Sequence, residues 1–191
     1  MLDRKPQILD VASELLQTRS FTSFSYQDLS DRLGISKASI HHHFASKEEL
    51  LLALTARYRS GQRGRLDELD RKYPRPSERL EAYLAAMSRV ANEGSKICPL
   101  GALQSEFNVI PEAVRADIQE LFQYTKRWLS GVLSEGRERG EMEFEGSPAE
   151  RAVLIMSAVQ GALQIARAAG PKEFTAVTGQ IKLDLKPRKR D

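Results

Sequence analysis

The sequence of 191 residues predicts an all-α protein with a small N-terminal and a larger C-terminal helical domain. Apolar residues recur at the three- and four-residue spacing of helices, and no segment sustains the alternation typical of a strand. Serines that suit helix N-termini stand three places before a carboxylate at several points. The prolines of Tyr73-Pro74-Arg75-Pro76 interrupt the helical pattern, so they mark the predicted boundary between the domains.

The composition is that of a water-soluble protein. Hydrophobic residues make up 41% of the chain and charged residues 29%, and no uninterrupted apolar run is long enough to cross a bilayer. The N-terminus mixes acids with bases instead of showing the apolar block of a secretion signal. Cys98 is the single cysteine, which excludes an internal disulfide. We therefore expect a cytoplasmic protein with no membrane contact.

Charge is unevenly distributed along the chain. Residues 1–72 carry 12 Lys and Arg against 10 Asp and Glu, and residues 73–181 carry 12 against 14. The last ten residues carry five bases against two acids. Two basic ends around a mildly acidic middle suit an anionic partner that binds the ends.

The N-terminal part predicts four helices. The first is expected from about Arg4 to Arg19, because one face collects Ile8, Val11, Ala12, Leu15 and Leu16. Ser25 and Ser46 each precede a carboxylate by three residues and should cap the second and fourth helices. Between them, Gly34 can end a helix in a left-handed conformation, and Ser36 can cap the next one.

The C-terminal part predicts a longer set of helices. Ser77 is expected to cap one helix, and a break around Cys98-Pro99 leads to a short helix over residues 102–108. Long helices are expected from Pro111 and from the capping sequence Ser147-Pro148-Ala149-Glu150, before a short final helix. The predicted domains are residues 1–50, a connecting helix at 51–73, residues 74–185 and a disordered basic tail at 186–191.

Residues 21–50, FTSFSYQDLSDRLGISKASIHHHFASKEEL, resemble the DNA-binding segment of the TetR family. The family's second helix, glycine turn, Ser-Lys helix start, aromatic-His-Phe ending and Ser-Lys-Glu-Glu-Leu cap all have counterparts here. The resemblance implies an N-terminal helix-turn-helix DNA-binding domain and a C-terminal ligand-binding and dimerisation domain. His41 departs from the family, which usually has tyrosine there. Histidine keeps a hydrogen-bond donor but has a shorter reach.

The spacing of apolar residues supports the same interpretation. The two short helices can pack inward through the apolar side chains of Leu29, Leu33, Ile35, Ile40 and Phe44. The opposite side of the helix that follows Ser36 then remains available for the major groove. Residues at helix N-termini are placed for phosphates. The predicted DNA-binding residues are Ser25, Tyr26, Gln27, Ser36, Lys37, Ala38, Ser39, His41, His42 and Lys47.

Metal binding and catalysis are not expected. Consecutive helical residues point about 100° apart, so His41, His42 and His43 cannot chelate one ion by themselves. We expect His43 to pack inward and the other two to face outward. The sequence has no phosphate loop, ligand cluster or nucleophile motif, which argues against an enzyme and against a cofactor.

The resemblance also implies a homodimer and an effector. In the family the last two long helices pair with their copies, which implies Pro111–Arg139 and Ser147–Ala169 as the dimer surface and a near-palindromic operator in double-stranded DNA. The candidate effector-binding residues, for a small molecule that is apolar or thiol-reactive, are Tyr83, Met87, Val90, Cys98, Leu103, Phe107, Phe122, Trp128 and Met156. Each of these side chains could instead serve core packing, and Cys98 could be a buried apolar residue instead of a thiol sensor. An architectural or adaptor protein without an effector remains an alternative.

Overall fold

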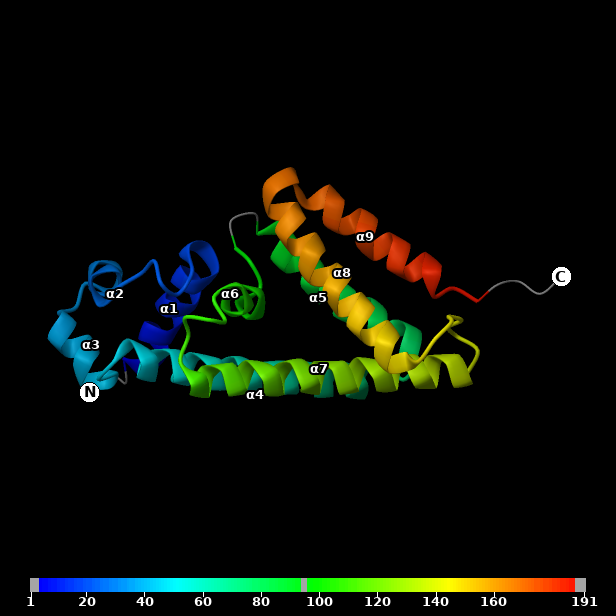
Figure 1. Ribbon diagram of the computed structural model, residues 1–191, viewed down its shortest axis with the longest axis horizontal. Helices are drawn as coiled ribbons and strands as arrows, with labels where there is room; N and C mark the ends of the chain where they lie inside the picture. Colours follow the sequence, from blue (N-terminus) through cyan, green and yellow to red (C-terminus); the bar gives the residue numbers. More distant parts are fainter. Residues whose placement is uncertain (1–3, 94–95, 188–191) are drawn as a thin grey trace. The chain divides into compact units, whose positions relative to one another are not determined.

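The structure, a computed structural model, describes residues 4–93 and 96–187 (Figure 1). Within these ranges it contains nine α-helices and no strand, which confirms the all-α prediction. The chain divides into two compact units, Met1–Gly61 with Ser95–Glu120 and Gln62–Gly94 with Leu121–Asp191. The helices α4 and α7 contribute residues to both units.

The N-terminal unit is built from helices that are far apart in the sequence. It comprises α1 (Lys5–Arg19), α2 (Tyr26–Leu33), α3 (Lys37–His43), α6 (Pro99–Ser105) and the first parts of α4 (Lys47–Lys72) and α7 (Glu112–Glu138). Helix α2 packs against α1 and α3, and α6 packs against α1. The predicted helix-turn-helix is therefore supported by a segment from the second half of the sequence.

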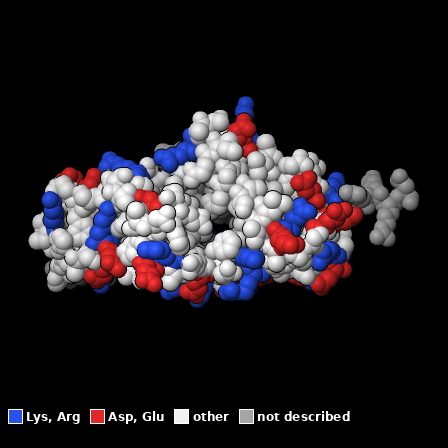
Figure 2. All heavy atoms as spheres, in the orientation of Figure 1, with Lys and Arg blue, Asp and Glu red and all other residues white. Residues whose placement is uncertain are grey.

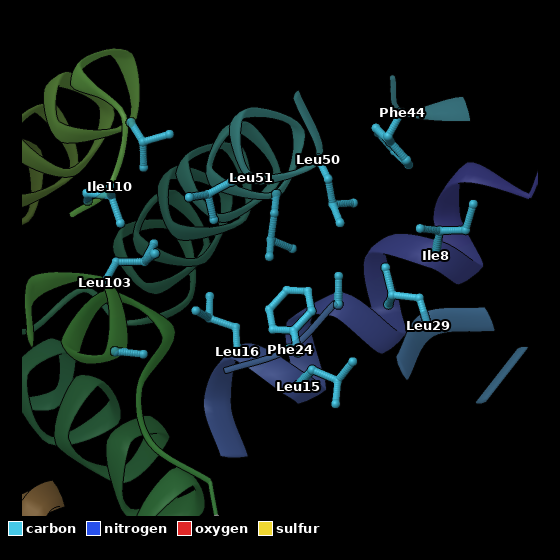
Figure 3. Close-up of a cluster of buried hydrophobic side chains, with 14 of the residues drawn as sticks. Ile8, Leu15, Leu16, Phe24, Leu29, Phe44, Leu50, Leu51, Leu103 and Ile110 are labelled. Atoms are coloured by element: carbon cyan, nitrogen blue, oxygen red, sulfur yellow. The ribbon is translucent and has the colours of Figure 1, made fainter. Parts of the chain in front are cut away.

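One hydrophobic core joins these helices. Leu16 of α1, Leu51 of α4 and Leu103 of α6 are each at most 1% exposed and enter the same cluster, together with Ile110 (Figure 3). The sequence placed residues 95–120 in the C-terminal domain. The structure places them in the N-terminal unit, because their apolar side chains are buried against α1 and α4.

The turns of the helix-turn-helix follow the predicted capping residues. Ser25 and Asp28 form a reciprocal capping box at the start of α2, and Gly34 ends that helix with a left-handed backbone at φ 64°. The hydroxyl of Ser36 accepts a hydrogen bond from the Ser39 amide at 3.1 Å. At the start of α4, Ser46 caps the Glu49 amide, but the carboxylate of Glu49 accepts from the amide of Ala45.

The C-terminal unit contains α5 (Pro76–Asn92), α8 (Pro148–Ala169), α9 (Pro171–Asp184) and the remaining parts of α4 and α7. Helices α5, α8 and α9 pack against one another. The predicted cap at Ser147 is confirmed, with Pro148 in the first turn and Glu150 completing the capping box. Helix α9 has 14 residues and is a full partner of α8, where only a short final helix was expected.

Two helix starts differ from the sequence prediction. Ser77 does not cap α5, because its amide and its hydroxyl both donate to the carboxylate of Glu141, at 3.1 and 2.6 Å. Helix α6 begins at Pro99, three residues before the expected start, because proline suits the first turn of a helix. The basic tail that was expected to be disordered comprises residues 186–191, and residues 188–191 of it lie outside the described part of the chain.

Helix α8 alone, within the described residues, is long and apolar enough to cross a membrane by length and composition. That result is weak support for a membrane span, because core helices of soluble proteins have the same composition. Seven residues of α8 are buried within the unit, among them Ile155, Val159 and Leu163.

Candidate nucleic-acid interface

Helix α3 exposes the side that the sequence assigns to DNA. Ile40 is completely buried and anchors the helix in the core. Lys37, Ala38, His41 and His42 are exposed. Because the helix follows a tight glycine turn and is held on its inner side, it can enter a major groove with this exposed side.

The first turn of α3 offers polar groups near Lys37. Ser36 is exposed, and its hydroxyl oxygen accepts the Ser39 amide while its hydrogen can still be donated. Ser39 is half-buried, so it presents less of its side chain than Lys37 does. The first turn therefore presents one cation and hydroxyl donors, which are groups that contact base edges and phosphates.

The start of α2 presents Ser25 and Gln27. Both are exposed, and the Gln27 amide nitrogen donates to the Ser25 hydroxyl at 3.2 Å. Hydrogen bonds from Ser25, aided by the positive charge of Arg19, lower the pKa of the Asp28 carboxyl. Arg19 lies 2.9 Å from this carboxylate, which reduces the repulsion that Asp28 would exert on a nearby phosphate.

Tyr26 does not present its side chain to DNA. It is 8% exposed, and its hydroxyl donates to the carbonyl oxygen of Phe44 at 2.9 Å. Burial raises the pKa of Tyr26 to about 12, with a contribution from the charge of Glu49. This residue was expected to bind phosphate because it lies at a helix N-terminus, and the inward position of its side chain leaves only its backbone for that contact. Its contribution is instead to join the start of α2 to the end of α3.

Lys47 also turns its side chain inward. Its ammonium group donates to the carbonyl oxygens of Phe21 and Phe24 and lies 4.4 and 4.5 Å from the centroids of their rings. Burial lowers the pKa of Lys47, although the nearby carboxylates of Glu106 and Asp28 oppose that shift. A phosphate contact by this ammonium group is therefore not available in this conformation.

The three consecutive histidines of α3 have different surroundings. The ring of His41 lies 4.6 Å from that of Tyr26, and its Nδ1 lies 3.3 Å from the carbonyl oxygen of Ala45. His42 is exposed and His43 is half-buried, as expected. No group of three or more potential metal ligands occurs among the residues that the structure describes.

Two basic residues near α3 were missed by the sequence analysis. Arg4 and Lys5 begin α1, and the ammonium group of Lys5 lies 5.9 Å from the ring centroid of Phe44 at the end of α3. Both are exposed. The sequence feature that could have indicated them is a pair of adjacent basic residues at a helix N-terminus. Only the fold shows that this N-terminus lies beside the end of α3.

Charges of both signs are interspersed on the visible face of the protein (Figure 2). Lys and Arg do not gather there into one continuous basic surface.

The candidate effector residues fall into both units. Tyr83, Met87 and Val90 lie on α5, Phe122 and Trp128 on α7, and Met156 on α8. The rings of Tyr83 and Trp128 lie 5.7 Å apart, and the indole nitrogen of Trp128 donates to both carboxylate oxygens of Asp70 at 3.0 Å. These aromatic residues are therefore brought together within the C-terminal unit.

The other three candidates belong to the N-terminal unit. Leu103 is 1% exposed in the core shared with α1 and α4, so its contacts are those of a packing residue. Phe107 packs at the edge of that core, and the guanidinium carbon of Arg115 lies 6.0 Å from its ring centroid. Cys98, the single cysteine of the chain, is half-buried and lies directly before α6.

An apolar groove of about 250 Å³ lies between α8 and α9. None of the candidate effector residues lines it; its lining residues are Arg151, Leu154, Ile155, Ala158, Val177, Gln180, Ile181, Asp184 and Leu185. Leu154, which lines the groove, is 57% exposed. Ile165 on α8 and Leu183 on α9 are 52% and 64% exposed. This face of the C-terminal unit is thus unusually apolar for a surface.

Two family profiles match the chain. One is described as "Bacterial regulatory proteins, tetR family" and matches residues 8–54; the other is described as "Tetracyclin repressor-like, C-terminal domain" and matches residues 76–179. The chain belongs to the TetR family. TetR-family proteins are DNA-binding transcriptional regulators and not enzymes. They act as dimers that respond to small-molecule effectors.

Known TetR-family proteins are similar over nearly the whole chain. The crystal structure of a TetR-family regulator from Agrobacterium tumefaciens is 32% identical and has a TM-score of 0.92, with 96% of this chain and 97% of that one covered. A TetR regulator from Legionella pneumophila is 27% identical, with a TM-score of 0.87 and coverage of 97% and 99%. The transcriptional repressor NemR of Escherichia coli strain K12 is 26% identical over 84% of this chain and 82% of its own length.

Proposed function

We propose that the protein is a homodimeric repressor that binds a near-palindromic operator through α3 and leaves it when an effector binds. The exposure of Lys37, Ala38, His41 and His42, on a helix whose opposite side is fixed in the core, carries this proposal. A two-fold dimer presents two such helices, so it reads two related half-sites about one helical turn or slightly more apart.

The residues at the interface take different roles in this proposal. Lys37, in the first turn of α3, contacts a base edge or an adjacent phosphate, since the N-terminal part of a recognition helix lies deepest in the groove. His41 and His42 supply donors farther along the helix. Ser25, Gln27, Ser36 and the bases Arg4 and Lys5 contact phosphates, which fix the register of α3.

The dimer surface is proposed to lie on α8 and α9. The family resemblance implied Pro111–Arg139 with Ser147–Ala169, which correspond to α7 and α8, but the exposed residues of α7 include Glu112, Gln119, Gln123 and Arg127. Three of the four exposed large apolar residues in the described part of the chain lie on α8 and α9: Leu154, which lines the groove described above, Ile165 and Leu183. The fourth, Val109, precedes α7. An apolar surface of this kind favours association with a second copy, and an α8–α9 pair gives a four-helix interface.

The effector is proposed to be a small apolar or aromatic molecule bound by the C-terminal unit. The proximity of the Tyr83 and Trp128 rings supports this class of ligand. A ligand releases DNA only by binding more tightly to the conformation that fits the operator poorly. A thiol-reactive effector is the second candidate, because the single thiol of the chain, on Cys98, is half-buried directly before α6.

Selection from a random pool of duplex DNA tests the operator proposal. The purified full-length protein should enrich a near-palindromic sequence, and Lys37→Ala should weaken binding to it by about tenfold or more, since a groove contact contributes about 1–3 kcal/mol. Lys72→Ala is the matched control, because Lys72 is an exposed lysine at the end of α4. Without any enriched sequence, and with binding that only fades as salt rises, the repressor proposal is wrong and the architectural alternative gains support.

The selected duplex also tests whether oxidation of the Cys98 thiol releases the protein from DNA. Hydrogen peroxide oxidises a cysteine thiol to sulfenic acid and is itself reduced to water. If Cys98 is the sensor, mild peroxide releases the wild-type protein from the duplex but leaves Cys98→Ser bound. Equal release of both proteins assigns the response to another group.

A cytoplasmic location is also proposed, because the DNA target lies there.

A further inference from the structure

The turn between α1 and α2 has an unusual backbone. Ser20 follows the last residue of α1 and has φ 85° and ψ 163°, a conformation that is nearly restricted to glycine. It is the one residue other than glycine with positive φ in the described ranges. A serine held in this conformation is strained, so the surrounding contacts must favour it.

The carboxylate of Glu106 occupies this turn. It accepts hydrogen bonds from the backbone amides of Phe21 and Thr22, at 2.6 and 3.0 Å, and from the Thr22 hydroxyl. The Ser20 side chain also helps to lower the pKa of this carboxyl. Two successive amides that point at one carboxylate form a backbone anion site, and the positive φ of Ser20 is what turns them toward it.

The other side of the same turn is held by Lys47. Its ammonium group donates to the carbonyl oxygens of Phe21 and Phe24, so amides and carbonyls of one short segment are bound by opposite charges. Lys47 begins α4, whereas Glu106 directly follows α6. The turn that leads into the DNA-binding helices is thus fixed by two charged residues from two other helices of the same unit.

Helix α6 is joined to α1 at its other end as well. The amide of Ile97 donates to the carbonyl oxygen of Gln17 at 3.2 Å, three residues before the strained Ser20. Between these two hydrogen-bonded ends, Ala102 and Leu103 are buried in the core that α1 shares. A displacement of α6 therefore acts on the end of α1 and on the turn after it.

We propose that Glu106 is a positioning residue that seats the α1–α2 turn and transmits the position of α6 to the DNA-reading helices. The proposal rests on the DNA-binding function proposed above. With the carboxylate in place, the strained turn is stable and α2 keeps its orientation on α1. When α6 moves away, the amides of Phe21 and Thr22 lose their acceptor, the turn relaxes, and α2 and α3 lose the arrangement that fits the operator.

Glu106→Gln tests this role with little change in shape. The neutral amide keeps one acceptor oxygen but loses charge-assisted bonding, so operator affinity should fall about fivefold to tenfold. Glu112→Gln is the matched control, because it removes the charge of an exposed glutamate six residues later. Amide hydrogen exchange adds a readout independent of DNA: Phe21 and Thr22 should exchange about tenfold faster in Glu106→Gln, while Ile40 keeps its protection.

A second variant separates positioning from general stability. Ser20→Gly removes the backbone strain, so the turn needs the carboxylate less, and Glu106→Gln should weaken operator binding less in the Ser20→Gly protein than in the wild type. Unchanged exchange at Phe21 and Thr22, or equal operator affinity of Glu106→Gln and wild type, overturns the proposal. If the wild type binds no operator, the repressor proposal fails instead, and the exchange measurement still decides whether Glu106 seats the turn.

Discussion

Hydrogen bonds inside the N-terminal unit decide which polar side chains remain available for DNA. Tyr26 and Lys47 stand at helix N-termini, where phosphate contacts are common, yet the hydroxyl of one and the ammonium of the other bond to backbone carbonyls of the protein. Lys37 and His42 have no such inward role and are exposed. Residue type and position in a helix are therefore insufficient to assign a DNA contact.

Tyr26→Phe should separate the two roles. Removing the hydroxyl leaves the buried carbonyl of Phe44 without its donor, so the free energy of unfolding should fall by about 1–2 kcal/mol. Operator affinity of the folded variant should change less than twofold, since the hydroxyl does not reach DNA in our assignment. Chemical denaturation and a binding titration measure both quantities. A large loss of affinity with unchanged stability would restore Tyr26 as a phosphate ligand.

At the scale of the helices, the capping residues were the most accurate guide. Ser25, Gly34, Ser36 and Ser147 were assigned from sequence and act as predicted, because a cap depends on residues within one turn of the chain. Ser77 failed because a carboxylate 64 residues away, on Glu141, takes its hydrogen bonds. Local patterns cannot show such a competitor.

The link between α6 and the α1–α2 turn should appear in how the free energy of unfolding depends on pH under acid conditions. Burial acts to raise the pKa of Glu106, but hydrogen bonds from Thr22, Phe21 and Ser20 outweigh it, so the net shift is downward from 4.5. A carboxyl whose pKa is lower in the folded state stabilises the fold above its unfolded pKa. That contribution is lost as the pH falls through the folded value.

Glu106→Gln should therefore lose less stability than the wild type as the pH falls through the acid range in which carboxylates take up protons. Unfolding free energies at several pH values measure the difference. The charged neighbours Lys47 and Asp28 are present in both proteins, so the difference between the two curves isolates Glu106. Parallel curves would mean that the carboxyl is not bonded in solution as it is in the structure.

At the scale of the whole molecule, the dimer depends on which apolar surface remains after each unit has packed. Leu154→Glu combined with Ile165→Glu places charges in the proposed α8–α9 interface, where burial without a partner is unfavourable. Sedimentation should show a monomer, and operator affinity should fall by at least tenfold because the two half-sites are no longer bound together. Gln123→Glu on α7 is the control and should remain dimeric. The opposite pattern would support pairing through α7.

The sequence by itself determined the helical class, most helix ends and the resemblance to the TetR family, and it supplied the proposal for the DNA-reading helix, since these depend on short-range periodicity, caps and a contiguous motif. Tertiary structure decided that residues 95–120 join the N-terminal unit and that α9 completes an apolar face with α8. It also revealed the contact of Glu106 with the α1–α2 turn. These features join residues some 85 positions apart or depend on which surfaces stay uncovered, and both are settled by packing of the whole chain.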